Sequence, residues 1–250
     1  MGTHPSAPSI LKDSSTSLSD VLASDPSLVG DKVRRRFGKG NLPFLFKILS
    51  IQKALSIQAH PDKELAKQLH VCDTKNYKGT SSHKFFSSAY KDSNHKPEMT
   101  IALTDFTGFC GFRPLPEISR FLSIVPELST LVGPAVKAFQ SSFATSPSEG
   151  KAALRELFTA LMTSKQDDIA AQAELLIDRA KNDGTLGDNE GLAKLLVELD
   201  SQFPKDIGLF CAFFLNYVKL RPGEAMFLRA RDVHAYISGG TLIFVERWLM

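Results

Sequence analysis

The stretch LSIQAHPDKE, residues 55–64, places a glutamine and a histidine two positions apart. The same spacing recurs in NHKPEM, residues 94–99, which places a lysine and a glutamate two positions apart. Residues i and i+2 of a β-strand point to the same face of the sheet. If both stretches are strands, their polar side chains can converge on one point. Burying such a cluster is costly unless something binds there.

Each of these predicted strands has one polar and one apolar face. In residues 55–60 the polar face holds Ser56, Gln58 and His60, and the apolar face holds Leu55, Ile57 and Ala59. In residues 96–103 one face holds Lys96, Glu98, Thr100 and Ala102, and the other holds Met99, Ile101 and Leu103. We expect both apolar faces to belong to a core and both polar faces to meet water or a ligand.

Four of the polar residues form a candidate metal site: Gln58, His60, Glu98 and, from RDVHAY further along the chain, His234. Together they offer an amide oxygen, two imidazole nitrogens and a carboxylate, which suits zinc or a similar divalent ion. A shell without thiolate is more typical of a catalytic site than of a structural one. The alternatives are an exposed polar strand face and a histidine satisfied within a core. His4, His70, His83 and His95 are not expected to bind metal.

The bulk composition is that of an ordinary globular protein, with 250 residues, 43% of them hydrophobic and a net charge of +3. The basic run at residues 32–36 is typical of a solvated helix end, so no nucleic-acid partner is expected. The three cysteines form no CxxC pair, which indicates a reducing compartment, and we expect a cytoplasmic protein. No apolar run reaches the roughly 18 residues of a membrane span, and no membrane partner is expected.

The chain changes character twice. Residues 41–60 and 97–114 are strand-like, whereas residues 116–203 show helical periodicity. In that block the amphipathic faces recur at i, i+3, i+4 and i+7: Leu154, Leu157, Phe158 and Leu161, and again Leu192, Leu195, Leu196 and Leu199. Strand-like sequence returns afterwards, with a type II turn expected at Arg221–Glu224. We therefore predict one β domain interrupted by a helical insertion.

Several motifs in this order resemble the type I phosphomannose isomerase family. They are NLPFLFKILS (41–50), LSIQAHPDKELA (55–66), NHKPEM (94–99), IALTDFTGFCGFRP (101–114) and LRPGEAMFLRARDVHAY (220–236). The resemblance runs from Met1 to about Gly239 and covers only the central part of a family member.

The resemblance implies a mixed, β-dominated fold, an incomplete cupin-type β jelly roll with an inserted α-helical domain. The implied domains are residues 1–115 and 206–250 for the β part and 116–205 for the insertion. It implies one zinc per chain, held by Gln58, His60, Glu98 and His234. It also implies interconversion of mannose 6-phosphate and fructose 6-phosphate, in supply of GDP-mannose synthesis, with Lys96 as a catalytic and substrate-binding residue and Ser56 near the substrate phosphate.

The sequence also departs from the family pattern. Family members begin upstream of Met1, and the tail at residues 240–250 diverges from the family's continuation. We therefore expect a truncated or alternatively terminated form, with open sheet edges and exposed apolar faces. Two alternatives to an active isomerase follow. One is a homologue that binds metal or sugar phosphate without turnover, and the other is a cupin-like interaction protein without metal.

Overall fold

The computed structural model describes residues 2–3, 8–12, 14–37, 42–62, 64–66, 68, 97–143, 146–184, 186 and 190–246. Its strands are β1 (Phe44–Ile51), β2 (Gln58–Ala59), β3 (Glu98–Ala102), β4 (Phe106–Phe112), β5 (Leu215–Leu220), β6 (Ala225–Leu228) and β7 (Val233–Glu246). The helices that precede them are α1 (Leu18–Ser24), the 3-10 helix η1 (Pro26–Val29) and α2 (Asp31–Phe37). The helices between β4 and β5 are α4 (Leu115–Ile124), α5 (Pro126–Val132), α6 (Ala135–Ser142), α7 (Pro147–Met162), α8 (Gln166–Asp183), α9 (Glu190–Gln202) and α10 (Gly208–Cys211).

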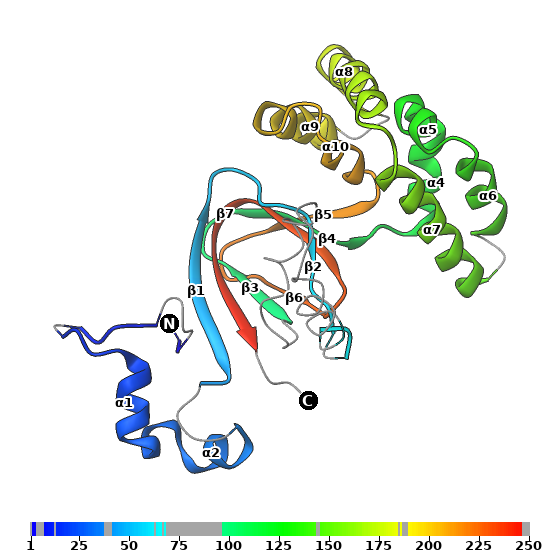
Figure 1. Ribbon diagram of the computed structural model, residues 1–250. Coiled ribbons are helices and arrows are strands. Elements are labelled where there is room, and N and C mark those ends of the chain that lie inside the picture. The colour runs from blue at the N-terminus through cyan, green and yellow to red at the C-terminus, as the bar shows by residue number, and fades with distance from the viewer. Residues whose placement is uncertain are drawn as a thin grey trace, which may run out of the picture.

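Strand β7 is the centre of a curled antiparallel sheet (Figure 1). Its first half pairs with β2 on one side and with β4 on the other. Its second half pairs with β1 and β3 in the same way. Strands β5 and β6 complete the outer row, on β4 and β3 respectively. Strands from before and after the helices therefore form one sheet, which confirms the predicted β fold with a helical insertion.

The two halves of β7 meet at a bend at Gly239. This residue has φ +106°, a region that side chains other than glycine rarely adopt. A Cβ at this position would also overlap the backbone carbonyl of Asp105, in the loop between β3 and β4. The strand can therefore turn from one half of the sheet to the other only because residue 239 has no side chain.

The loop between β5 and β6 contains a tight turn. The Glu224 N–H donates to the Arg221 carbonyl over 3.0 Å, and Gly223 between them has φ +89°. Both features match a type II turn with glycine at its third position, as predicted. The Gly223 N–H then donates to the Ala102 carbonyl over 2.8 Å, which ties this turn to the end of β3.

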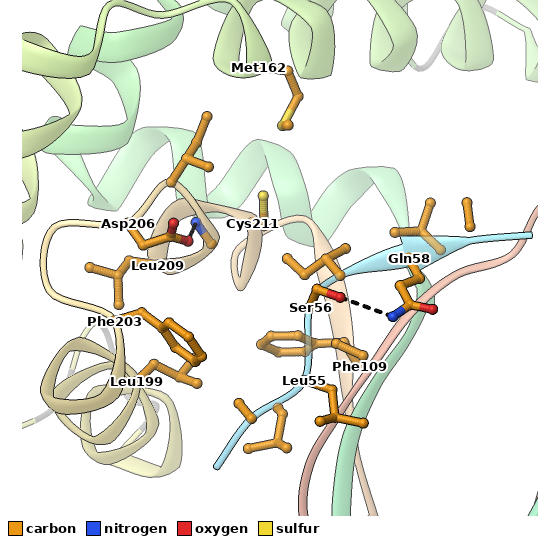
Figure 2. A pocket seen from close by; sticks show the side chains of 18 of the residues that line it. Leu55, Ser56, Gln58, Phe109, Met162, Leu199, Phe203, Asp206, Leu209 and Cys211 are labelled. Atoms are coloured by element: carbon orange, nitrogen blue, oxygen red, sulfur yellow. Dashed lines mark hydrogen bonds between the residues drawn. The ribbon is translucent and has the colours of Figure 1, made fainter. Parts of the chain in front are cut away.

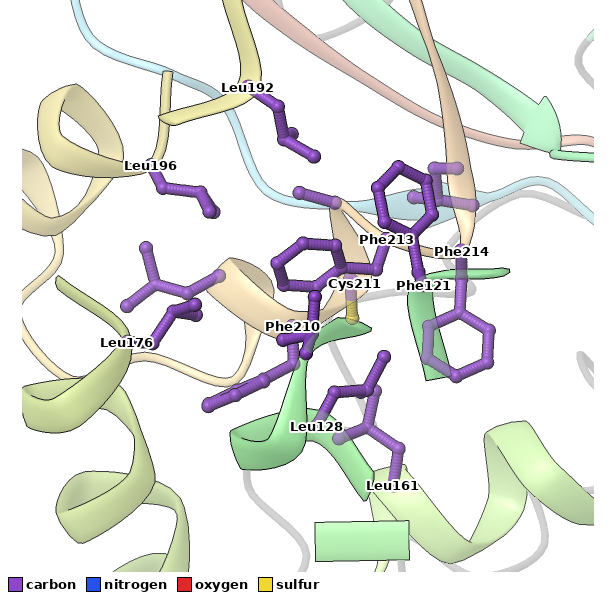
Figure 3. Close-up of a cluster of buried hydrophobic side chains, with 14 of the residues drawn as sticks. Phe121, Leu128, Leu161, Leu176, Leu192, Leu196, Phe210, Cys211, Phe213 and Phe214 are labelled. Carbon is purple, nitrogen blue, oxygen red and sulfur yellow. The ribbon is translucent and has the colours of Figure 1, made fainter. Parts of the chain in front are cut away.

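The helices α4–α10 gather at one end of the sheet, and α1 and α2 lie away from them (Figure 1). The predicted leucine faces of α7 and α9 are buried in this block, where Leu157, Leu161 and Leu196 are fully enclosed. Phe210, Phe213 and Phe214 pack into the same cluster, at the point where α10 leads into β5 (Figure 3). The insertion is thus attached to the sheet through a continuous apolar core.

Local sequence signals set the helix ends and positions. The Ser146 hydroxyl accepts a hydrogen bond from the Glu149 N–H and caps the start of α7. Gly184 in the left-handed conformation ends α8. Between helices, the Arg179 guanidinium of α8 donates two hydrogen bonds, of 2.9 and 2.8 Å, to the Glu127 carboxylate of α5. The Asp62 side chain accepts a hydrogen bond from the Leu65 N–H over 2.9 Å and caps the helical turn at residues 64–66.

The predicted burial of the apolar face of β3 is wrong. Glu98, Thr100 and Ala102 are buried, whereas Met99 and Leu103 are exposed. The sheet curls so that the polar side of β3 faces its interior, where hydrogen bonds satisfy the buried polar groups. The apolar side faces outward.

The predicted strand at residues 55–60 is also only partly correct. Just Gln58 and Ala59 form a strand, and Leu55 and Ala59 are exposed rather than part of a core. The reason is that both border an open cavity between the sheet and the helices. Ile57 alone of the three apolar residues packs against the main core cluster.

The segment expected to diverge, residues 240–250, begins inside the sheet. Residues 240–246 continue β7 and pair with β1 and β3, and residues 247–250 lie outside the described part. Among the described residues, no helix is long and apolar enough to cross a membrane.

Candidate metal centre

Three of the four predicted ligands meet in the interior of the curled sheet. His234 lies near the start of β7, Glu98 is the first residue of β3, and His60 follows β2. One ligand atom from each of these residues lies within 4.8 Å of the other two. Two ligand atoms of one tetrahedral zinc ion would be roughly 3.3 Å apart. The three side chains are therefore close to the spacing that a single ion requires.

The carboxylate of Glu98 lies between the two imidazoles. Its Oε1 is 3.5 Å from His60 Nε2, and its Oε2 is 4.0 Å from His234 Nε2. The two imidazole rings themselves are tilted, with centroids 5.3 Å apart. Two nitrogens and one carboxylate oxygen thus face a common point, which is the donor set that zinc accepts.

Glu98 is charged although only 7% of it is exposed. Burial alone would raise the pKa of Glu98, but hydrogen bonds to His60 and Tyr236 and the positive charges of His60 and Lys47 lower it to about 2. The carboxyl group is therefore ionised at neutral pH, as a metal ligand must be.

His234 is held in the neutral form and in one tautomer. Burial lowers the pKa of His234, and Glu98 and the Asp232 carbonyl only partly oppose that shift. Its Nδ1 is 2.9 Å from the Asp232 carbonyl oxygen. Because that oxygen can only accept, Nδ1 carries the hydrogen and Nε2 is left with the lone pair. This is the arrangement by which proteins orient a metal-binding histidine.

Gln58 stands beside this group on the neighbouring strand. It is directly opposite His234 in the β2–β7 register, so both side chains leave the sheet on the same face. Its Nε2 donates to the Ser56 hydroxyl over 2.9 Å (Figure 2). Since that hydrogen bond uses an N–H of the amide, a metal would take the carbonyl oxygen.

A polar cavity of about 90 Å³ opens onto the cluster. Its lining includes Ser56, Gln58, Glu98 and His234, as the sequence predicted, and also Lys47 and Tyr236, which sequence reasoning missed. A signal existed for both. Tyr236 follows His234 at the i+2 spacing, and Lys47 alternates with apolar neighbours along β1. Lys96 and the other four histidines lie outside the described residues.

A second cavity of about 520 Å³ lies between residues 54–59 and the helices α7, α9 and α10 (Figure 2). It shares Leu55, Ser56 and Gln58 with the polar cavity. Aromatic and aliphatic side chains line most of it, and no basic side chain is among its described lining residues. A sugar phosphate fits this lining poorly, because its charge would remain unpaired.

The chain matches two sequence models of one family. Residues 1–115 match the type I phosphomannose isomerase catalytic domain, and residues 129–215 match the helical insertion domain of the same family. Of the three candidate ligands that come together, His60 and Glu98 lie within the first match.

The curated relatives that the chain matches belong to the same family. The mannose-6-phosphate isomerase of Aspergillus fumigatus is 46% identical over 260 residues, which cover 96% of this chain and 54% of the relative. The mannose-6-phosphate isomerase of Schizosaccharomyces pombe is 46% identical over 248 residues, which cover 97% of this chain and 56% of the relative. The chain therefore spans about half the length of the curated relatives that it matches.

A solved structure shows that the fold is also similar. A zinc-bound mannose 6-phosphate isomerase superimposes with a TM-score of 0.79 at 30% identity, covering 99% of this chain and 59% of the other. The curled sheet with its helical insertion is thus the cupin fold of these isomerases. Both sequence models, the curated relatives and the fold lead to one conclusion: the chain belongs to the type I phosphomannose isomerase family.

Proposed function

We propose that this chain carries the metal-binding part of a zinc-dependent mannose-6-phosphate isomerase. The observation that supports it most is the group of half-buried His60 with buried Glu98 and His234, whose ligand atoms lie within 4.8 Å of one another. The relatives that share this region are named for that activity, and one solved relative is zinc-bound. Gln58 is proposed as the fourth ligand, with one zinc per chain.

The proposed reaction moves a hydrogen between C1 and C2 of the open-chain sugar through an enediolate, so negative charge develops on the sugar oxygens. When bound, zinc would supply a Lewis acid that stabilises this charge. The ammonium group of Lys47 lines the same cavity and favours a negative substrate by electrostatics. Neutral His234 and ionised Glu98 keep their lone pairs directed into the site.

The remaining roles are proposals from the family resemblance. Ser56 lies at the mouth of the polar cavity, where its hydroxyl accepts from Gln58 and can meet a phosphate oxygen. Lys96 is proposed to assist catalysis and substrate binding. The domain boundaries at 115/116 and 205/206, a cytoplasmic location and a role in GDP-mannose supply complete the proposal.

A second candidate function is binding of metal or sugar phosphate without turnover. The observation that favours it is the ligand group itself, because His60, Glu98 and His234 can hold a metal ion whether or not a general base is present. The chemistry of the polar cavity is the same in both cases, so only turnover separates the two functions.

Turnover tests the proposal directly. The full chain, loaded with zinc, is expected to form fructose 6-phosphate from mannose 6-phosphate in a coupled assay. His234→Ala is expected to abolish that turnover, and His83→Ala, a histidine not expected to bind metal, is the matched control. Soluble, zinc-loaded protein without any turnover would contradict the isomerase proposal and favour the binding function.

A further inference from the structure

A chain of two buried hydroxyls ends on the Glu98 carboxylate. The Tyr236 hydroxyl donates to Glu98 Oε2 over 2.7 Å. The Thr100 hydroxyl donates in turn to the Tyr236 oxygen over 2.9 Å. All three residues are buried, and Thr100 is completely enclosed. Little of their surface meets water, which strengthens these hydrogen bonds and makes their geometry specific.

The direction of the two hydrogen bonds matters. A phenol has one proton, and the Thr100 hydroxyl occupies an acceptor position on the Tyr236 oxygen. Because the ionised Glu98 carboxylate can only accept, the phenolic proton points at Glu98. The Thr100 hydroxyl therefore donates to the Tyr236 oxygen and holds it in place, and Tyr236 fixes where Glu98 Oε2 lies.

The backbone and the packing hold all three groups in place. Glu98 and Thr100 are two residues apart on β3 and share its inner face, and Tyr236 approaches from β7. The Tyr236 ring packs edge-on against Phe106, with ring centroids 5.6 Å apart. A ring fixed by such packing cannot swing its hydroxyl away from the carboxylate without disturbing the core.

The remaining oxygen of Glu98, Oε1, faces His60. While Oε2 accepts from Tyr236, Oε1 is 3.5 Å from His60 Nε2. A carboxylate with one oxygen anchored can rotate very little, so the other oxygen keeps its direction. We propose that Tyr236 and Thr100 are positioning residues that set the Glu98 carboxylate for metal binding. This inference rests on the metal site of the proposed function.

Zinc affinity is the readout that tests it, because it does not depend on turnover. Metal-free full chain is titrated with zinc in competition with a chromophoric chelator, as wild type, Tyr236→Phe, Thr100→Val and the double variant. Tyr236→Phe is expected to weaken zinc binding about 10- to 100-fold, the usual effect of losing a partner that orients a metal ligand. Thr100→Val is expected to weaken it less.

The double variant shows whether the two hydroxyls act as a chain. If Thr100 acts only through Tyr236, adding Thr100→Val to Tyr236→Phe changes the zinc affinity no further. Tyr217→Phe is the matched control, since Tyr217 is a half-buried tyrosine that packs on Phe109 in β4. It is expected to leave zinc affinity unchanged.

Three results would overturn the inference. One is wild-type zinc affinity in Tyr236→Phe, and another is a double variant whose loss equals the product of the single losses. If Tyr236→Phe unfolds, as judged by the circular dichroism melt of the metal-free protein, wild-type affinity in Thr100→Val overturns it instead. Failure of the proposed metal site looks different, because wild type would then bind zinc no better than a His60→Ala/His234→Ala variant.

Discussion

The residue that ties the site together is Glu98. It is a buried carboxylate that contacts one histidine, faces a second and accepts a hydrogen bond from a tyrosine. His60, Tyr236 and the nearby Lys47 favour the ionised form, and together they outweigh the cost of burial. The stability of the folded protein therefore depends on the ionisation of this one side chain.

This linkage predicts an acid-sensitive stability in the metal-free protein. The pKa of Glu98 falls from 4.5 to about 2 on folding, so the stabilisation is present above pH 4.5. It is lost as the pH falls from 4.5 towards 2, because the unfolded state binds the proton first. Urea unfolding across that range should show a steeper loss for wild type than for Glu98→Gln.

The matched control for this experiment is Glu156→Gln, a change to an exposed residue of α7. It should keep the wild-type slope. Equal slopes for wild type and Glu98→Gln would contradict the linkage.

At the residue scale, the sequence predicted which side chains group together but not which way they face. The i, i+2 spacing placed Gln58 beside the later cluster, and it put Glu98 and Thr100 on one face. Alternation does not say which face points inward, however. In β3 the polar face lines the interior of the curled sheet, whereas the apolar face of a strand is usually assumed to be the buried one. Lys47 and Tyr236 follow the same alternation, but only the placement of β1 and β7 around one cavity shows that they line the site.

At the scale of elements, the long strand β7 carries the architecture. It pairs with four other strands and delivers His234 and Tyr236 from its first half. The bend at Gly239 is what allows one strand to serve both halves of the sheet. The site therefore depends on a glycine that contacts none of its residues.

Replacing Gly239 with alanine tests this dependence. We expect Gly239→Ala to destabilise the protein by about 2 kcal/mol or more, since it combines a positive φ with overlap on the Asp105 carbonyl. Gly240→Ala is the control, because the nearest atom to a Cβ there is a threonine methyl at 3.4 Å. Chemical denaturation of both variants measures the difference, and equal stabilities would contradict the account of the bend.

Helices were predicted better than short strands. The 3.6-residue period of α7 and α9 is strong because each helix buries one continuous apolar face. The strand predicted at residues 55–60 reduces to the two residues of β2, because only Gln58 and Ala59 pair with β7. Pairing partners decide the length of a short strand, and a single sequence does not contain them.

At the scale of the whole molecule, the sheet presents an apolar outer surface. Ile48 is 66% exposed, Phe227 is 56% exposed, and Met99 lies directly opposite Phe227 in the β3–β6 register. Phe244 lies opposite Met99 on the other side, so the apolar row crosses three neighbouring strands. Continuous apolar surface of this kind promotes association.

We therefore expect an Ile48→Lys/Phe227→Lys variant to be more soluble than wild type, without loss of zinc binding. Both side chains point away from the metal cluster. Static light scattering against concentration measures the effect, and Leu28→Lys, a change to an exposed leucine of η1, is the control. Unchanged scattering in the double variant would show that this surface does not drive association.

X-ray absorption at the zinc edge reports directly which atoms bind the metal. The full chain with one equivalent of zinc should show a first shell of nitrogen and oxygen only, with the scattering pattern of two imidazoles near 2.0 Å. In His234→Ala the imidazole contribution should fall. Sulfur scattering near 2.3 Å, or a wild-type spectrum unchanged in His234→Ala, would contradict the assignment of His60, Glu98 and His234 as zinc ligands.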